Sequence, residues 1–87
     1  MLNYERAFRE RVRVVNIPAQ CFERLLDAAR DLITQAGAAK ASYIVGYAGY
    51  APDLSYIALD WLHYTGRLIR VPQDSSADED QIYTKVV

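Results

Sequence analysis

The sequence has few of the residue types on which catalysis and metal binding depend. It contains one cysteine, Cys21, and one histidine, His63, and it has no glycine-rich phosphate loop. A single cysteine cannot form an internal disulfide, so a free thiol fits a reducing compartment. Cys21 and His63 fall on different predicted helices, without metal-ligand spacing. We therefore expect no enzymatic activity, no catalytic residues, no metal and no cofactor.

Long hydrophobic runs are also lacking. No stretch is long and apolar enough to span a bilayer, and residues 1–6 lack the features of a signal peptide. We therefore expect a soluble, cytoplasmic protein that does not bind a membrane. The 87 residues, 52% of them apolar, suffice for one small core, so residues 1–87 are expected to form a single domain. A core of this size gives marginal stability, and a partner often helps.

Basic residues are scarce in the second half of the chain. The formal net charge is -1, and residues 41–87 carry three basic side chains against six acidic ones. Domains that bind nucleic acid through their whole surface are usually basic. Four of the arginines fall within residues 1–15, where a helix to about Arg11 followed by extended chain and a strand over 11–15 are both compatible with the pattern.

Helical periodicity is clearest from Ala19 to about Ala36. Apolar residues recur there on one stripe, and the charged residues lie off it, with Asp27 close to Arg30 on the solvent side. Asn16 is a good helix cap, and the glycine after Ala36 is a helix stop.

A second, shorter helix is expected from Tyr43 to Ala48, with Ser42 as its cap. Gly46 within it costs about 1 kcal/mol relative to Ala. A glycine at this position also allows another backbone or ring to approach closely.

The next helix, over residues 54–65, has two apolar stripes. One contains Ile57 and Trp61, and the other contains Leu59. A helix that is apolar on two sides needs burial on two sides. A small core covers one of them, so either Leu59 or the Ile57/Trp61 pair is left for an interface.

Two strands are expected at residues 67–71 and 81–86. The loop between them carries four acids and no base. The predicted fold class is therefore mainly α with a small β-hairpin.

The order of these elements resembles that of the winged helix-turn-helix family. Residues 44–52, Ile-Val-Gly-Tyr-Ala-Gly-Tyr-Ala-Pro, are similar to the first helix and turn of a helix-turn-helix. Residues 62–71, Leu-His-Tyr-Thr-Gly-Arg-Leu-Ile-Arg-Val, resemble a recognition helix that runs into a wing strand. The resemblance covers about residues 19–86 and implies three to four helices plus a two-stranded wing.

Most winged-helix proteins bind duplex DNA, with the second helix of the motif in the major groove. The matching helix here, residues 54–65, has none of the Arg, Lys, Asn and Gln residues on which base readout mainly depends. A dimeric DNA-binding regulator is therefore the alternative function. Its contacts would be Arg11, Arg13, Arg67, Arg70 and Lys85.

The tyrosines favour a protein-interaction module instead. Seven are present, five of them between Tyr43 and Tyr64, and Tyr and Trp are enriched at protein interfaces. The expected interface is Tyr47, Tyr50, Tyr56, Leu59, Asp60, His63 and Tyr64. Acids around it favour a basic protein partner. Such a chain could inhibit or recruit a nucleic-acid-handling machine, as a phage or mobile-element inhibitor does. A homodimeric structural subunit is a third hypothesis.

Overall fold

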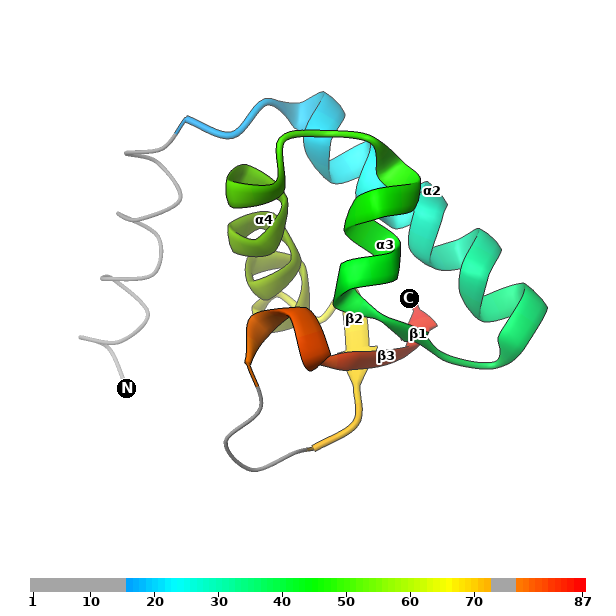
Figure 1. Ribbon diagram of the computed structural model, residues 1–87. Coiled ribbons are helices and arrows are strands. Elements are labelled where there is room, and N and C mark those ends of the chain that lie inside the picture. The colour runs from blue at the N-terminus through cyan, green and yellow to red at the C-terminus, as the bar shows by residue number, and fades with distance from the viewer. Residues whose placement is uncertain (1–15, 73–76) are drawn as a thin grey trace.

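The computed structural model describes residues 16–72 and 77–87 (Figure 1). This part of the chain contains three α-helices, a three-stranded antiparallel sheet and one 3-10 helix. In chain order these are α2 (Ala19–Ala36), β1 (Ala39–Lys40), α3 (Ala41–Ala48), α4 (Pro52–Tyr64), β2 (Leu68–Arg70), η1 (Asp78–Asp80) and β3 (Ile82–Val86). The expected mainly helical fold with a small β-hairpin is confirmed at this level. Residues 1–15, with Arg11 and Arg13, lie outside the described residues.

The helix α2 has the expected extent but not the expected cap. Its N-cap residue is Pro18, whose carbonyl accepts a hydrogen bond from the Cys21 amide at 3.0 Å. Asn16 instead adopts a left-handed conformation, with φ of 53°, two residues before the cap. Gly37 ends the helix with φ of 81°, and its N–H donates to the Ile33 carbonyl at 2.7 Å. A positive φ costs glycine little, which is why the helix stops there.

The helix α3 begins at Ala41, two residues earlier than the sequence predicts. Lys40 is its N-cap residue and makes no side-chain cap hydrogen bond, so the expectation that Ser42 caps the helix is wrong. The expected close approach at Gly46 is also absent: a methyl group there would have no neighbour within 4 Å. Gly46 is thus a helix-interior glycine with no packing reason in this structure.

A third strand, β1, lies against the expected hairpin. Ala39 pairs with Tyr83 and Lys40 with Ile82, so β3 is central and the strand order is β1-β3-β2. Between β2 and β3 the register shifts after Ile69, which produces an irregularity in the hairpin. The sequence analysis did not predict β1, because a strand of two residues is too short to show an alternation of apolar and polar residues.

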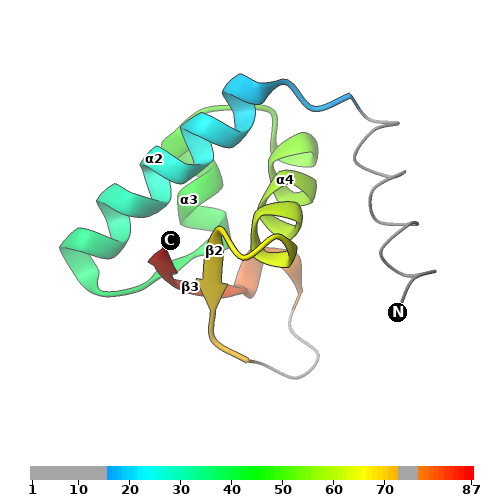
Figure 2. The same cartoon turned by 180° about the vertical axis from the view of Figure 1, so that it is seen from behind.

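The three helices pack on one another and bury the inner side of this sheet (Figure 2). The strands contribute Leu68, Tyr83 and Ala39 to the core, which are 0%, 1% and 7% exposed. None of the helices in residues 16–72 and 77–87 is long and apolar enough to cross a membrane.

The phase of α4 is now defined. Its buried residues are Ser55, Ala58, Leu59 and Leu62. Leu59 is 1% exposed and belongs to the core, so its expected place in an interface is wrong. Ile57 and Trp61 are half-buried on the other stripe. The small residues Ser55 and Ala58 on α4 and Cys21 and Ala29 on α2 are each 0% exposed, because small side chains let two helices pack closely.

Candidate interaction surfaces

The residues expected to form one interface each contact a different neighbour in the structure. Tyr47 is 56% exposed on α3, and its hydroxyl lies 3.4 Å from an Asp31 carboxylate oxygen on α2. Tyr50 is half-buried beneath Arg24, whose guanidinium carbon lies 5.7 Å from the ring centroid. Tyr56 is half-buried and packs against the core. These three tyrosines therefore differ in their exposure and in the groups that they contact.

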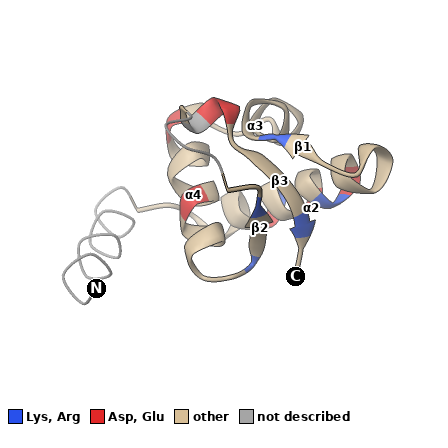
Figure 3. Ribbon diagram, turned by 90° about the horizontal axis from the view of Figure 1, so that it is seen from below, with Lys and Arg blue, Asp and Glu red and all other residues tan. Residues whose placement is uncertain are grey.

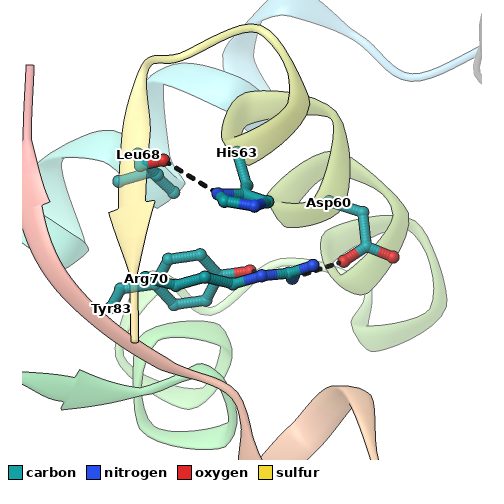
Figure 4. Close-up of polar contacts among 5 residues, drawn as sticks. All are labelled: Asp60, His63, Leu68, Arg70 and Tyr83. Atoms are coloured by element: carbon teal, nitrogen blue, oxygen red, sulfur yellow. Dashed lines mark hydrogen bonds and ion pairs between the residues drawn. The ribbon is translucent and has the colours of Figure 1, made fainter. Parts of the chain in front are cut away.

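Asp60 and His63 are half-buried and contact the strand β2 (Figure 4). An Asp60 carboxylate oxygen lies 3.1 Å from Nη1 of Arg70, and the same nitrogen lies 3.3 Å from the Tyr83 hydroxyl. Nδ1 of His63 lies 3.2 Å from the Leu68 carbonyl oxygen. Because a carbonyl only accepts, this contact places the imidazole proton on Nδ1.

The Asp60–Arg70 pair is partly shielded from water. The side chains of Arg70 and Asp60 are 25% and 20% exposed, and the guanidinium lies over the Tyr83 ring at 5.9 Å. Burial acts to lower the pKa of the Arg70 guanidinium, but the Tyr83 hydroxyl and the Asp60 carboxylate outweigh it and raise that pKa. The pair therefore ties α4 to β2. Arg70 is already engaged by a carboxylate, which weakens its expected role as a phosphate contact.

Tyr64 is 37% exposed at the end of α4. Its ring stacks on Trp61, with centroids 5.8 Å apart and planes inclined by 28°. Tyr64 thus belongs to the half-buried stripe of Trp61, away from the contacts of Tyr47.

The strongest exposed aromatic feature lies on α3. Tyr43 and Tyr47 are 66% and 56% exposed and stand four residues apart, on the side opposite the buried Ile44 and Val45. Sequence reasoning did not single out Tyr43. The spacing Tyr43–Tyr47, out of phase with Ile44 and Val45, was the available signal.

An apolar groove adjoins Tyr43. It has a volume of about 360 Å³ and lies between the C-terminal part of α2, β1 and β3. Its lining includes Leu32, Ala36, Ala39, Lys40, Tyr43 and Ile82. We call this groove, together with Tyr43 and Tyr47, the α3 face.

Acidic residues border the α3 face. Asp31 lies beside Tyr47, and η1, with the exposed Glu79 and Asp80, contacts α3 (Figure 3). Lys40 is the cation at this border, and its amine lies 3.8 Å from an Asp80 carboxylate oxygen. Both side chains are about half exposed, so the pair contributes little to stability.

A different surface lies on the outer side of the hairpin. Arg67, Ile69, Lys85 and Val87 are all exposed there, and we call them the hairpin face. Neither Arg67 nor Lys85 forms an ion pair with a described residue. Of the expected DNA contacts, Arg67 and Lys85 are the two that are exposed and form no ion pair within residues 16–72 and 77–87.

The described residues contain no group of three His, Cys, Asp or Glu side chains that could hold a metal ion. Cys21 is fully buried, and desolvation raises the pKa of its thiol against the opposing effects of Ser55 and Arg24. A buried, protonated thiol is a poor nucleophile. No protein-family model, curated protein or solved structure matches this chain.

Proposed function

We propose that the protein is a small protein-interaction module on a winged-helix scaffold. The scaffold is supported by the order α2-β1-α3-α4-β2-β3 and by the strand order β1-β3-β2. In this assignment α3 and α4 form the helix-turn-helix, and β2 and β3 form the wing. The two-residue strand β1 is an addition to the expected two-stranded wing.

The observation that carries the proposal is the α3 face. Tyr43 and Tyr47 are each more than half exposed, and Tyr43 lines an apolar groove. Tyrosine offers a large contact area, a polar tip and a low entropy cost on binding, so it is enriched among the residues that dominate interface energies. Side-chain truncation at such positions commonly costs about 2 kcal/mol or more of binding energy.

The charges at the border of this face favour a basic partner. Asp31, Glu79 and Asp80 lie next to α3 or contact it, and the helix α4 has no Arg, Lys, Asn or Gln. Complementary charge raises the association rate and disfavours acidic competitors. A basic partner fits an inhibitor or adaptor of a nucleic-acid-handling machine, of the kind that phages and mobile elements encode.

The test is a quantitative pull-down with matched variants. The wild-type chain is compared with Tyr43→Ser/Tyr47→Ser and with Tyr64→Ser, an exposed tyrosine outside the α3 face. We expect partners recovered by the wild type to be lost with the double variant and retained with Tyr64→Ser. Titration calorimetry of the purified partner should then show at least tenfold weaker binding to the double variant, which corresponds to about 1.4 kcal/mol.

An identical set of bound proteins for the wild type and the double variant would refute the proposal, provided that circular dichroism shows the same fold. Light scattering over a concentration series separates this proposal from the homodimer hypothesis. A homodimer predicts that the average molecular mass rises with protein concentration, and that Tyr43→Ser/Tyr47→Ser lowers this mass.

A DNA-binding regulator remains the second candidate because Arg67 and Lys85 are exposed and have no ion pair with the described residues. Arg67 and Lys85 would neutralise two phosphates per protomer, which contributes about -2 per protomer to the salt slope on logarithmic axes. Titration of duplex DNA at low and moderate salt tests it. Micromolar or tighter binding that is lost in Arg67→Ala/Lys85→Ala would favour the regulator over the interaction module.

A further inference from the structure

We infer that the hairpin face and the groove beside it form a second docking site, which binds an extended acidic segment carrying an apolar side chain. This site is distinct from the α3 face in its residues and its charge. Its partner has the opposite charge from the partner proposed for the α3 face.

The positions of the two cations on the hairpin follow from the strand register. Ile69 pairs with Lys85, and the Val87 amide donates to the Arg67 carbonyl at 3.0 Å. Arg67 and Lys85 therefore occupy diagonal positions on the same side of the hairpin. Residues at such positions in an antiparallel pair are about 7 Å apart.

This spacing matches that of alternate residues in an extended peptide. Each residue of a strand rises about 3.4 Å, so side chains two residues apart point the same way and are separated by about 7 Å. Two carboxylates at i and i+2 can each face one cation. Ile69 and Val87, which are 42% and 65% exposed between these cations, then pack against the methylene groups of the bound segment.

The groove extends this surface beyond Arg67. It lies between α2 and α4, has a volume of about 380 Å³, and its lining includes Phe22, Glu23, Leu26, Trp61, Leu62 and Arg67. Pockets of this size accommodate ligand groups, and apolar and aromatic walls favour an apolar one. Because Glu23 also lines the groove, an uncharged side chain belongs there and the carboxylates belong at Arg67 and Lys85.

The hairpin face fits such a peptide better than duplex DNA. The third cation of the hairpin, Arg70, is held by Asp60 at 3.1 Å, so only two cations are left for phosphates. Affinity for duplex DNA grows with the number of neutralised phosphates. Ile69 and Val87 gain nothing from a phosphate backbone, whereas they bury apolar area against a peptide.

The experiment uses Trp61, the only tryptophan of the chain, as a reporter within the groove. The probe is the synthetic peptide Phe-Ser-Glu-Ser-Glu-Ser-Phe, which presents both carboxylates and one phenyl ring to the site in either chain direction. Titration of the full chain should change the emission of Trp61 in a saturable way. The peptide with Lys in place of Glu, and the peptide with Ser in place of Phe, should each bind at least tenfold more weakly.

Charge reversal at the exposed cations completes the test. Arg67→Glu and Lys85→Glu should each weaken binding of the probe at least tenfold, and raising the salt should weaken it in the wild type. Arg30→Glu makes the same change in net charge on α2 and should bind as the wild type does. Since these side chains are exposed, the variants are expected to fold, which circular dichroism checks.

Three results would overturn the inference. The first is a wild-type chain that does not respond to the probe. The second is probe binding that is unchanged in Arg67→Glu and Lys85→Glu. The third is duplex DNA that binds the same cations more tightly than the peptide at equal salt. Variants of Tyr43 and Tyr47 leave this site intact, so a failure of the α3 face and a failure of the hairpin face are distinguishable.

Discussion

Replacing Ser55 with Ala should stabilise the protein. Ser55 is 0% exposed, and its hydroxyl oxygen has no hydrogen-bond partner among the described residues. The hydroxyl lies near enough to the Cys21 thiol to lower the pKa of that thiol, but the geometry of a hydrogen bond is not met. A thiol is in any case a weak partner. The hydroxyl therefore loses its water on folding without adequate replacement.

The magnitude has two parts of the same sign. A buried polar group without a partner costs about 1–3 kcal/mol, and only the part that the thiol does not offset is recovered. Alanine also favours the helix interior over serine by about 0.5 kcal/mol. Loss of one buried oxygen atom removes a few packing contacts, which offsets part of the gain. We expect the free energy of unfolding to rise by about 1–2 kcal/mol.

Urea unfolding followed by circular dichroism measures this change, with an unchanged m-value as the sign that only stability has altered. In a domain of this length, each kcal/mol raises the melting temperature by about 4–8 °C. Ser42→Ala is the matched control, because Ser42 lies within α3 but is only half-buried, so it reports the gain in helix propensity alone. A Ser55→Ala variant less stable than the wild type would show that the hydroxyl is satisfied, and the reasoning would be wrong.

Three further changes have expected outcomes. Gly46→Ala should raise the free energy of unfolding by about 1 kcal/mol in urea titration, because an added methyl group meets nothing within 4 Å; a loss of stability would show that α3 needs the glycine. A double-mutant cycle with Asp60→Asn and Arg70→Met should give a coupling energy of about 1–2 kcal/mol, above that of an exposed pair, and a coupling near zero would remove the proposed tie between α4 and β2. Cys21 should react with a thiol reagent slowly in the native protein and rapidly in urea. Because burial raises the pKa of Cys21, the unfolded chain loses that proton first; stability should fall as the pH rises above the ordinary thiol value of 9.0, and Cys21→Ala should reduce this loss in pH-dependent unfolding.

The elements that the sequence predicted well are those with local signals. The helix α2 runs from Ala19 to Ala36 as expected, because its periodic stripe and Gly37 are both local features. The ion pair of Asp27 with Arg30, at 3.1 Å, follows from their three-residue spacing. The strand β1 depends on pairing with Tyr83, more than forty residues away, and so it left no pattern in the sequence.

The phase of α4 was undetermined for a related reason. Both of its stripes are apolar, so the choice depends on the partner helix. The small residues Cys21 and Ala29 on α2 and Ser55 and Ala58 on α4 are all fully buried. Leu59 lies in the core with them, whereas Ile57 and Trp61 are half-buried. Leu59 is buried and is therefore not available to an interface. Asp60 and His63, which were also expected in the interface, instead contact β2. The spacing of residues along the chain does not predict these contacts.

The distribution of charge shows why a whole-chain average misleads about partners. The whole chain has a net charge of -1, which taken alone would predict that the protein does not bind an anionic ligand. In the structure, Asp60 compensates Arg70 between α4 and β2, so neither charge faces a partner alone. Asp31 and η1 make the border of the α3 face acidic, whereas Arg67 and Lys85 are left on the hairpin face without a counter-ion among the described residues. Because exposed charges farther apart than about 8–10 Å are screened at physiological salt, each surface selects its partner by its own charge. The two proposed docking surfaces, which differ in the sign of their charge, would allow the proposed adaptor to hold two different partners at once.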